Sequence, residues 1–320
     1  MPKRTAPYWR PDPYFRRAAL IAVFFVLPSL WVGLQLDDYF HWALVQRLPG
    51  LPVADMPGSW FHLFGFLDGN PERAQDLMDK GMLPWWALQE VRYAFWRPVV
   101  EFTHALDYLA WPHEPWLMHL HSIVWFVLML WLAHRLYDVL LGSDAARWAT
   151  LVFALHYSHG LPVGWLANRN GLMATFFVLL TVLIHHRGGG RFSLWAMLAY
   201  ITALLCGELG VSAGLILLAY AICLDNRAVA QRVVSLVPYM LVGGLWLIMR
   251  KQFGYGAQGS GHYLDPVHDF ADFLEAFVVR AADLLNGQFL LLPPEMSALL
   301  PLPLRLGIAS VVLGLLLTYG

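Results

Sequence analysis

Two adjacent carboxylates, Asp37 and Asp38, follow the first apolar run of the chain, which extends over residues 18–36. An ionisable side chain near lipid usually pairs, faces a cavity or has a functional role. A carboxylate can act as a general base, and a like-charged neighbour raises its pKa. We predict that Asp37 and Asp38 are the acidic centre of an active site. The alternative is that they only mark where a helix leaves the bilayer. His41, one turn later, is either a substrate contact or an interface residue.

Five basic residues fall in loops that the predicted topology places on the same side as this pair: Arg92, Arg97, Arg169, Arg250 and Lys251. Basic residues there run against the positive-inside rule, and an anionic ligand would account for them. For Arg92 and Arg97 the alternative is that long loops largely escape the rule. Glu208 lies in another turn on this side, where it either pairs with Arg169 or Arg250 or contacts an acceptor.

The segment after Arg97-Pro98 predicts a helix, because proline is favoured in the first helical turn. Glu101, His104 and Tyr108 then fall on one face of that helix, with Asp107 to one side. We expect Glu101 and Asp107 to pair with nearby arginine more readily than to catalyse, and we include Glu101 among the substrate-binding candidates.

Four histidines further along the chain could bind a metal or a substrate. His119 and His121 point to different faces of a helix, whereas His156 and His159 share one face. A metal cluster of His119, His156 and His159 is one option, and we leave a divalent metal open. Hydrogen bonding inside a polar membrane cavity is preferred, because buried polar groups there need partners. We include His119 and His159 among the substrate-binding candidates.

The composition predicts a protein embedded in a membrane. Apolar residues make up 58% of the chain and charged residues 13%, whereas a soluble domain carries about 25% charged residues. The net charge of -1 gives no overall field that would favour nucleic acid. Basic residues before the first apolar run, among them Arg16 and Arg17, place the N-terminus in the cytoplasm.

We expect an all-α, polytopic fold in which residues 1–320 form one transmembrane domain. The predicted spans are 18–36, 116–141, 148–165, 171–184, 192–224 (two short spans broken at 206–208) and 233–249. Residues 37–97 form a long first extracytoplasmic loop, with interfacial helices predicted over 59–67 and 82–96. The segment 270–292 fits a surface helix or one that lines a wet cavity. The chain ends inside the apolar segment 306–319, which favours a fragment of a longer protein.

Several short motifs follow one another in a recognisable order. After the Asp-Asp pair and the Arg-Pro helix, Trp116-Leu117-Met118-His119 opens the second span, and residues 153–159 lead into residues 164–169. This order resembles the GT-C superfamily of polyprenyl-phosphate-sugar-dependent glycosyltransferases. Within it, the match is to the protein O-mannosyltransferase group that carries tetratricopeptide repeats in animals, and to its bacterial relatives. The resemblance covers roughly residues 15 to 210, with a looser match at 290–294, and rests on the order of short motifs.

Three positions depart from those relatives. Tyr157 replaces a proline, Leu161 stands where a glutamate is expected, and Gly171 stands where an aspartate often follows the arginine. These departures concern the acceptor and the level of activity more than the fold.

The resemblance implies an inverting glycosyltransferase in which Asp37 deprotonates an acceptor hydroxyl and Asp38 assists. The donor would be a polyprenyl-phosphate sugar, the acceptor a protein or glycan, and the location a bacterial inner membrane. Arg97, Arg169 and Arg250 would balance the charge of the leaving phosphate. Two alternatives stay open: a non-catalytic scaffold or fragment of this fold, and a transporter of a lipid-linked or anionic solute. Convergence of these side chains on one site would favour the enzyme.

Overall fold

The computed structural model describes residues 13–48, 62–259, 263–264, 270–290 and 293–319. The chain divides into two compact units. The first contains the described residues of Met1–Leu155 and His159–Gly256, and the second those of His156–Ser158 and Ala257–Gly320. Every residue predicted to be catalytic or to bind substrate lies in the first unit, whereas His156, a candidate metal ligand, belongs to the second. One transmembrane domain over residues 1–320 stays a prediction.

Helices dominate the first unit. Its α-helices are α1 (Pro13–Val26), α2 (Asp37–Gln46), α3 (Pro71–Asp79), α4 (Pro98–Ala110), α5 (Pro115–Leu141), α6 (Ser143–Ala154), α7 (Gly160–Gly164), α8 (Arg169–Arg187), α9 (Leu194–Cys206), α10 (Ser212–Cys223) and α11 (Val229–Gln252). The 3-10 turns η1 (Leu27–Trp31), η4 (Leu166–Asn168) and η5 (Glu208–Val211) lengthen or connect them. Pro28 falls where α1 gives way to η1, as expected of a proline within a helix.

Four of these helical segments are long and apolar enough to cross a membrane: Pro13–Trp31, Pro115–Leu141, Leu166–Arg187 and Val229–Gln252. Shorter apolar helices cover Leu194–Cys206, Glu208–Cys223 and Leu302–Thr318. The mostly helical fold is therefore confirmed, and its apolar helices suit a membrane-embedded protein.

The single span predicted over 148–165 is wrong. Helix α6 has only 12 residues and ends at Ala154, which gives it a length of about 18 Å against a hydrocarbon core of about 30 Å. Gly160, Pro162 and Gly164 follow within a short distance. These residue types are poor helix formers, and the chain continues after α6 as a 3-10 turn over Tyr157–His159 and the five-residue helix α7 instead of one long helix.

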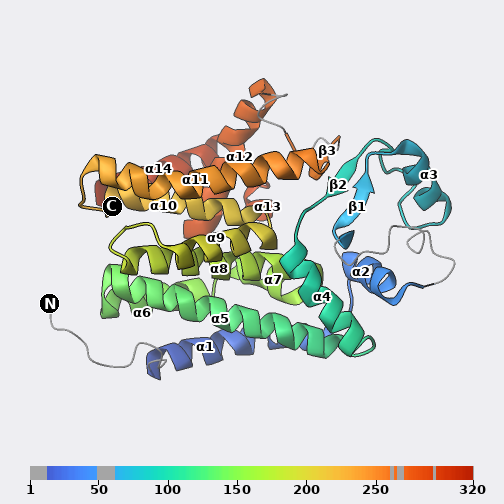
Figure 1. The fold of residues 1–320 in the computed structure, drawn as a ribbon, viewed down its shortest axis with the longest axis horizontal. Helices are drawn as coiled ribbons and strands as arrows, with labels where there is room; N and C mark the ends of the chain where they lie inside the picture. Colours follow the sequence, from blue (N-terminus) through green and yellow to red (C-terminus); the bar gives the residue numbers. More distant parts are fainter. Residues whose placement is uncertain (1–12, 49–61, 260–262, 265–269, 291–292, 320) are drawn as a thin grey trace. The chain divides into compact units, whose positions relative to one another are not determined.

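Helices α5, α8 and α9 lie side by side in the first unit, and α4 contacts both α8 and α9 (Figure 1). A large apolar cluster between α5, α8, α9, α10 and α11 includes the buried Tyr200 and Tyr239. A second joins α1 to α5 through Phe15 and Phe126. A third, which includes Phe64, packs α4 and α5 against the segment before β1. These clusters fix the helix ends that carry the polar residues described below.

The first long loop contains a strand pair where interfacial helices were predicted. Strand β1 (Gly65–Asp68) pairs antiparallel with β2 (Arg92–Ala94), with Gly65 opposite Ala94 and Asp68 opposite Arg92. The prediction of helices over 59–67 and 82–96 is therefore wrong at residues 62–67 and 82–96. Residues 59–61 lie outside the part of the chain that the structure describes. A short apolar run does not distinguish a strand from a helix. The helix of this loop is α3 instead, which Asn70 caps by accepting hydrogen bonds from two backbone N–H groups.

The second unit contains α12 (Phe270–Leu290), α13 (Pro294–Ser297) and α14 (Leu302–Tyr319), and the short strand β3 (Gly256–Gln258) falls at its boundary in the sequence. Asp283 on α12 forms an ion pair with Arg305 and accepts a hydrogen bond from Ser297 at 2.9 Å. Asp283 is thereby accounted for as a structural link between α12 and the helices that follow.

Candidate functional site

The Asp37-Asp38 pair occupies the first turn of α2, immediately after a strained backbone position. Leu36 has φ 41° and ψ -111°, a conformation that favours glycine. Strain of this kind costs about 1–3 kcal/mol and persists where the surrounding structure requires it. The turn at Leu36 allows the two carboxylates to begin a helix directly after the first apolar segment.

Asp38 is fully buried, and each of its carboxylate oxygens accepts a backbone hydrogen bond. Its Oδ2 accepts a hydrogen bond from the Gln35 N–H at 3.0 Å, and its Oδ1 accepts one from the Ala167 N–H at 2.7 Å. Burial raises the pKa of Asp38 to about 6, although these N–H donors oppose the rise. Asp38 therefore joins the start of α2 to the turn η4.

Asp37 differs from its neighbour. It is half-buried, and its carboxylate has no hydrogen bond or ion pair among the described residues. Burial raises its pKa above the usual value, and the positive charge of Arg97 acts against that rise. A partly exposed carboxylate with free acceptor oxygens and an elevated pKa has the properties of a general base.

Arg97, Glu208 and Arg250 form a second charged group. Nε and Nη2 of Arg97 donate to Glu208 Oε2 at 3.2 and 3.0 Å, and Arg250 Nε lies 3.4 Å from Glu208 Oε1. The Arg97 guanidinium also lies over the rings of Phe64 and Phe95. The expected pairing of Glu208 with Arg250 is confirmed, and Arg97 joins it. The group carries one net positive charge beside Asp37.

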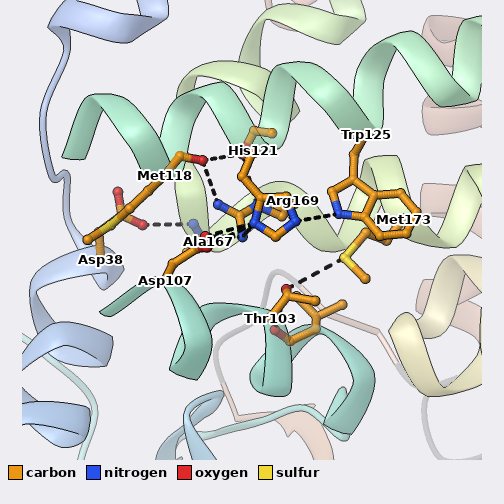
Figure 2. Close-up of polar contacts among 11 residues, drawn as sticks. Asp38, Thr103, Asp107, Met118, His121, Trp125, Ala167, Arg169 and Met173 are labelled. Carbon is orange, nitrogen blue, oxygen red and sulfur yellow. Dashed lines mark hydrogen bonds and ion pairs between the residues drawn. The ribbon is translucent and has the colours of Figure 1, made fainter. Parts of the chain in front are cut away.

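Arg169 is placed in a different environment, completely buried among its own partners (Figure 2). Its guanidinium donates to Ser122 Oγ at 2.9 Å, to Asp107 Oδ2 at 2.5 Å and to the Met118 carbonyl at 2.7 Å. The expected pairing of Asp107 with an arginine is confirmed. Arg169 has no ion pair with Glu208 among the described residues and no surface to offer a ligand.

His121 completes this buried network. Trp125 Nε1 donates to His121 Nε2 at 3.1 Å, and His121 Nδ1 lies 2.9 Å from Asp107 Oδ1 and 3.2 Å from Arg169 Nη1. Helices α4, α5 and α8 are tied together by these bonds (Figure 2). The network acts as a structural junction between these three helices.

A buried cluster of polar side chains surrounds Phe64. His41 and His104 have ring centroids 5.4 Å apart, and both pack against Phe64. Glu101 Oε1 accepts from the Phe64 N–H at 3.5 Å, and its Oε2 has no hydrogen-bond partner among the described residues. Burial lowers the pKa of His41 to about 3 and raises that of Glu101 to about 8. These groups are therefore neutral near pH 7.

The remaining predicted contacts, His119 and His159, have hydrogen-bond partners outside the charged group. His119 donates from Nε2 to the Gly33 carbonyl at 2.9 Å, and His159 donates from Nε2 to the Phe153 carbonyl at 2.7 Å. Both bonds fix backbone positions. Lys251 is exposed. Among the described residues, no three His, Cys, Asp or Glu side chains are arranged to hold a metal ion.

Three features of the site have only weak signals in the sequence. Gly207 precedes Glu208 with φ 157°, and a Cβ there would lie 3.6 Å from Arg97 Nε. A Gly-Glu step between two apolar runs indicates that the helix breaks there, but it does not indicate which residue Glu208 pairs with. Leu36 has no residue signal for its positive φ, and the His121–Asp107 contact joins different helices.

No protein-family model, curated protein or solved structure matches this chain significantly.

Proposed function

We propose that this protein is an inverting glycosyltransferase of GT-C type. It transfers a sugar from a polyprenyl-phosphate carrier to an acceptor hydroxyl at the extracytoplasmic face of a membrane. The observation that carries the proposal is the position of Arg97, which acts electrostatically on the unpaired Asp37 and binds Glu208, the partner of Arg250. A candidate base and two candidate phosphate-binding cations therefore belong to one group.

In the proposed reaction, Asp37 accepts the proton of the acceptor hydroxyl, whose oxygen attacks the anomeric carbon as the bond to phosphate breaks. Arg97 and Arg250 balance the charge that develops on the leaving phosphate. Asp38 holds the start of α2 in position through its bonds to Gln35 and Ala167. Arg169 has a structural role in this scheme, contrary to the expectation that it contacts the phosphate.

The polytopic topology also belongs to the proposal. Asp37 follows the helical segment that ends at Trp31, Glu208 follows α9, and Arg250 lies in the last turn of α11. Arg187, Arg191, Arg227 and Arg232 lie at the opposite helix ends, as a cytoplasmic side would require. A bacterial inner membrane, and a protein or glycan as the acceptor, suit this arrangement.

The test is sugar transfer in membranes that contain the wild type, Asp37→Asn or, as a matched surface control, Asp76→Asn. The donors are a panel of radiolabelled polyprenyl-phosphate sugars, with the mannosyl donor first. Loss of a carboxylate base lowers the rate by about 10²- to 10⁴-fold, and Asp76→Asn should transfer as the wild type does. Equal transfer by Asp37→Asn would reject the base, and no transfer by well-inserted wild type would reject the enzyme.

A non-catalytic scaffold of this fold is the second candidate. The observation in its favour is that Arg169 is completely paired and that Arg97 and Arg250 already share a carboxylate. Absence of transfer from every donor, with a stable and correctly inserted protein, would favour this candidate.

A further inference from the structure

Glu208 is the anion that occupies the space between two arginines in this structure. One oxygen, Oε2, receives both hydrogen bonds from Arg97, and the other, Oε1, lies 3.4 Å from Arg250 Nε. The carboxylate therefore stands where an external anion would bind both guanidinium groups.

The carboxylate is a poor fit for this position. Arginine binds a carboxylate most strongly when two N–H groups face two oxygens, whereas both donors of Arg97 converge on a single oxygen. Glu208 Oε1 and Arg250 Nε each lack a hydrogen bond among the described residues, although both atoms are buried. A phosphate group has more terminal oxygens than a carboxylate and could satisfy both arginines together.

The two arginines do not depend on Glu208 for their placement. The Arg97 guanidinium lies 4.9 Å from the Phe64 ring centroid and 4.4 Å from that of Phe95. Arg250 lies 6.0 Å from the Trp246 ring on its own helix. Both side chains would keep these aromatic contacts if the carboxylate moved away.

Glu208 follows a glycine, and its side chain is partly exposed. It opens the 3-10 turn η5 directly after Gly207, whose φ of 157° and ψ of 175° are essentially accessible to glycine only. Its side chain is 31% exposed, whereas that of Asp107, the partner of Arg169, is 2% exposed. Only the first of these two ion pairs is open to exchange with a solvent-borne or lipid-borne anion.

We propose that Glu208 is an internal substitute for a phosphate group, and that a phosphomonoester or phosphodiester must displace it to bind Arg97 and Arg250. This inference rests on the proposed function, in which the carrier is a polyprenyl phosphate. It adds that Glu208 blocks the phosphate site of its own protein, which we call the mask. Removing the charge of Glu208 should therefore strengthen the binding of phosphate.

The test is equilibrium binding of a short-chain polyprenyl phosphate to the full-length protein in detergent, with no turnover required. Glu208→Gln should bind about tenfold more tightly than the wild type, a difference of about 1.4 kcal/mol. Glu208→Gln combined with Arg250→Gln should lose that gain. Glu208→Asp shortens the side chain and keeps the charge, so its affinity should be intermediate. It replaces Glu208→Gln in the test if Glu208→Gln does not fold.

A parallel series with inorganic phosphate distinguishes a lipid-linked ligand from free phosphate. Tighter binding of either probe by Glu208→Gln supports the mask. Equal or weaker binding of both probes by folded Glu208→Gln and Glu208→Asp overturns it. Because binding is measured without transfer, a protein that binds but does not transfer contradicts the proposed enzyme while leaving the mask supported.

Discussion

The two arginine groups of the first unit use the same chemistry with opposite results. Arg169 is 0% exposed and divides its donors among Asp107, Ser122 and a backbone carbonyl. Arg97 and Arg250 are partly exposed and share one carboxylate, with buried polar atoms left unbonded. An arginine whose three guanidinium nitrogens all donate to buried partners stabilises helix packing, whereas a partly exposed one with spare donors can bind a ligand.

The largest effect is expected from breaking the buried group. Arg169→Met leaves the Asp107 carboxylate buried without its partner, which should lower the free energy of unfolding by about 3–5 kcal/mol. Arg250→Gln, the matched change in the partly exposed group, should cost at most about 1 kcal/mol. Thermal unfolding in detergent, followed by tryptophan fluorescence, measures both. Similar losses for the two variants would remove the distinction between the groups.

Glu101 tests how the burial of an incompletely hydrogen-bonded carboxyl group makes stability depend on pH. Its pKa is about 8 in the folded protein and 4.5 ordinarily, so the folded state binds the proton more tightly and stability falls as pH rises from about 4.5 to about 8. At about 1.4 kcal/mol per pH unit, the wild type should lose roughly 2–3 kcal/mol between pH 6 and pH 8. Glu101→Gln should flatten that part of the curve. Unfolding temperatures of both proteins measured between pH 6 and pH 8 test this prediction. Parallel curves for the two proteins would contradict the raised pKa of Glu101.

Gly207 tests the junction that carries Glu208. In Gly207→Ala the new Cβ would lie 3.3 Å from Asn170 Nδ2 and would occupy a backbone region that favours glycine, at a cost of about 1–3 kcal/mol. Gly244→Ala is the matched control, because nothing lies within 4 Å of its added Cβ inside α11. That control should gain up to about 1 kcal/mol. Thermal unfolding should therefore show a lower stability for Gly207→Ala and a higher stability for Gly244→Ala. A loss of stability in both variants would contradict this prediction.

The smallest difference is expected within the Asp pair. Asp38→Asn places an amide where two backbone N–H groups donate to a carboxylate, and should cost about 1–3 kcal/mol. Asp37→Asn should stay within about 0.5 kcal/mol, because no hydrogen bond of its carboxylate is lost among the described residues. Chemical unfolding curves of the two variants provide the comparison. An equal cost would mean that Asp37 is also a structural residue.

Local signals in the sequence were sufficient for several elements. Pro98 marks the start of α4, and the helical period places Glu101, His104 and Tyr108 on its buried face. The Gly207-Glu208 step marks the break between α9 and α10. These signals work because a proline, a glycine or a helical period constrains only neighbouring residues.

The partners of Arg169 could not be predicted in the same way. Asp107 lies 62 residues away in the sequence, and nothing local distinguishes it from Glu208 as an ion-pair partner. An exposed-loop arginine and a buried one also look alike in sequence, because the difference depends on how α4, α5 and α8 pack. Asp37 and Asp38 also cannot be told apart from the sequence. Their roles differ because the Ala167 N–H, which is distant in the sequence, donates to Asp38 only.

The bond between Asp38 and Ala167 also has a consequence for the order in which the protein is built. It spans 129 residues, as does the bond from Gln35 Nε2 to the Gly164 carbonyl. Contacts of such long sequence separation form late, because the intervening chain must first be arranged. A nascent chain that has not yet emerged beyond residue 167 therefore carries the Asp pair without its anchor. The carboxylates reach their final geometry only after the helices that surround them have been synthesised and assembled.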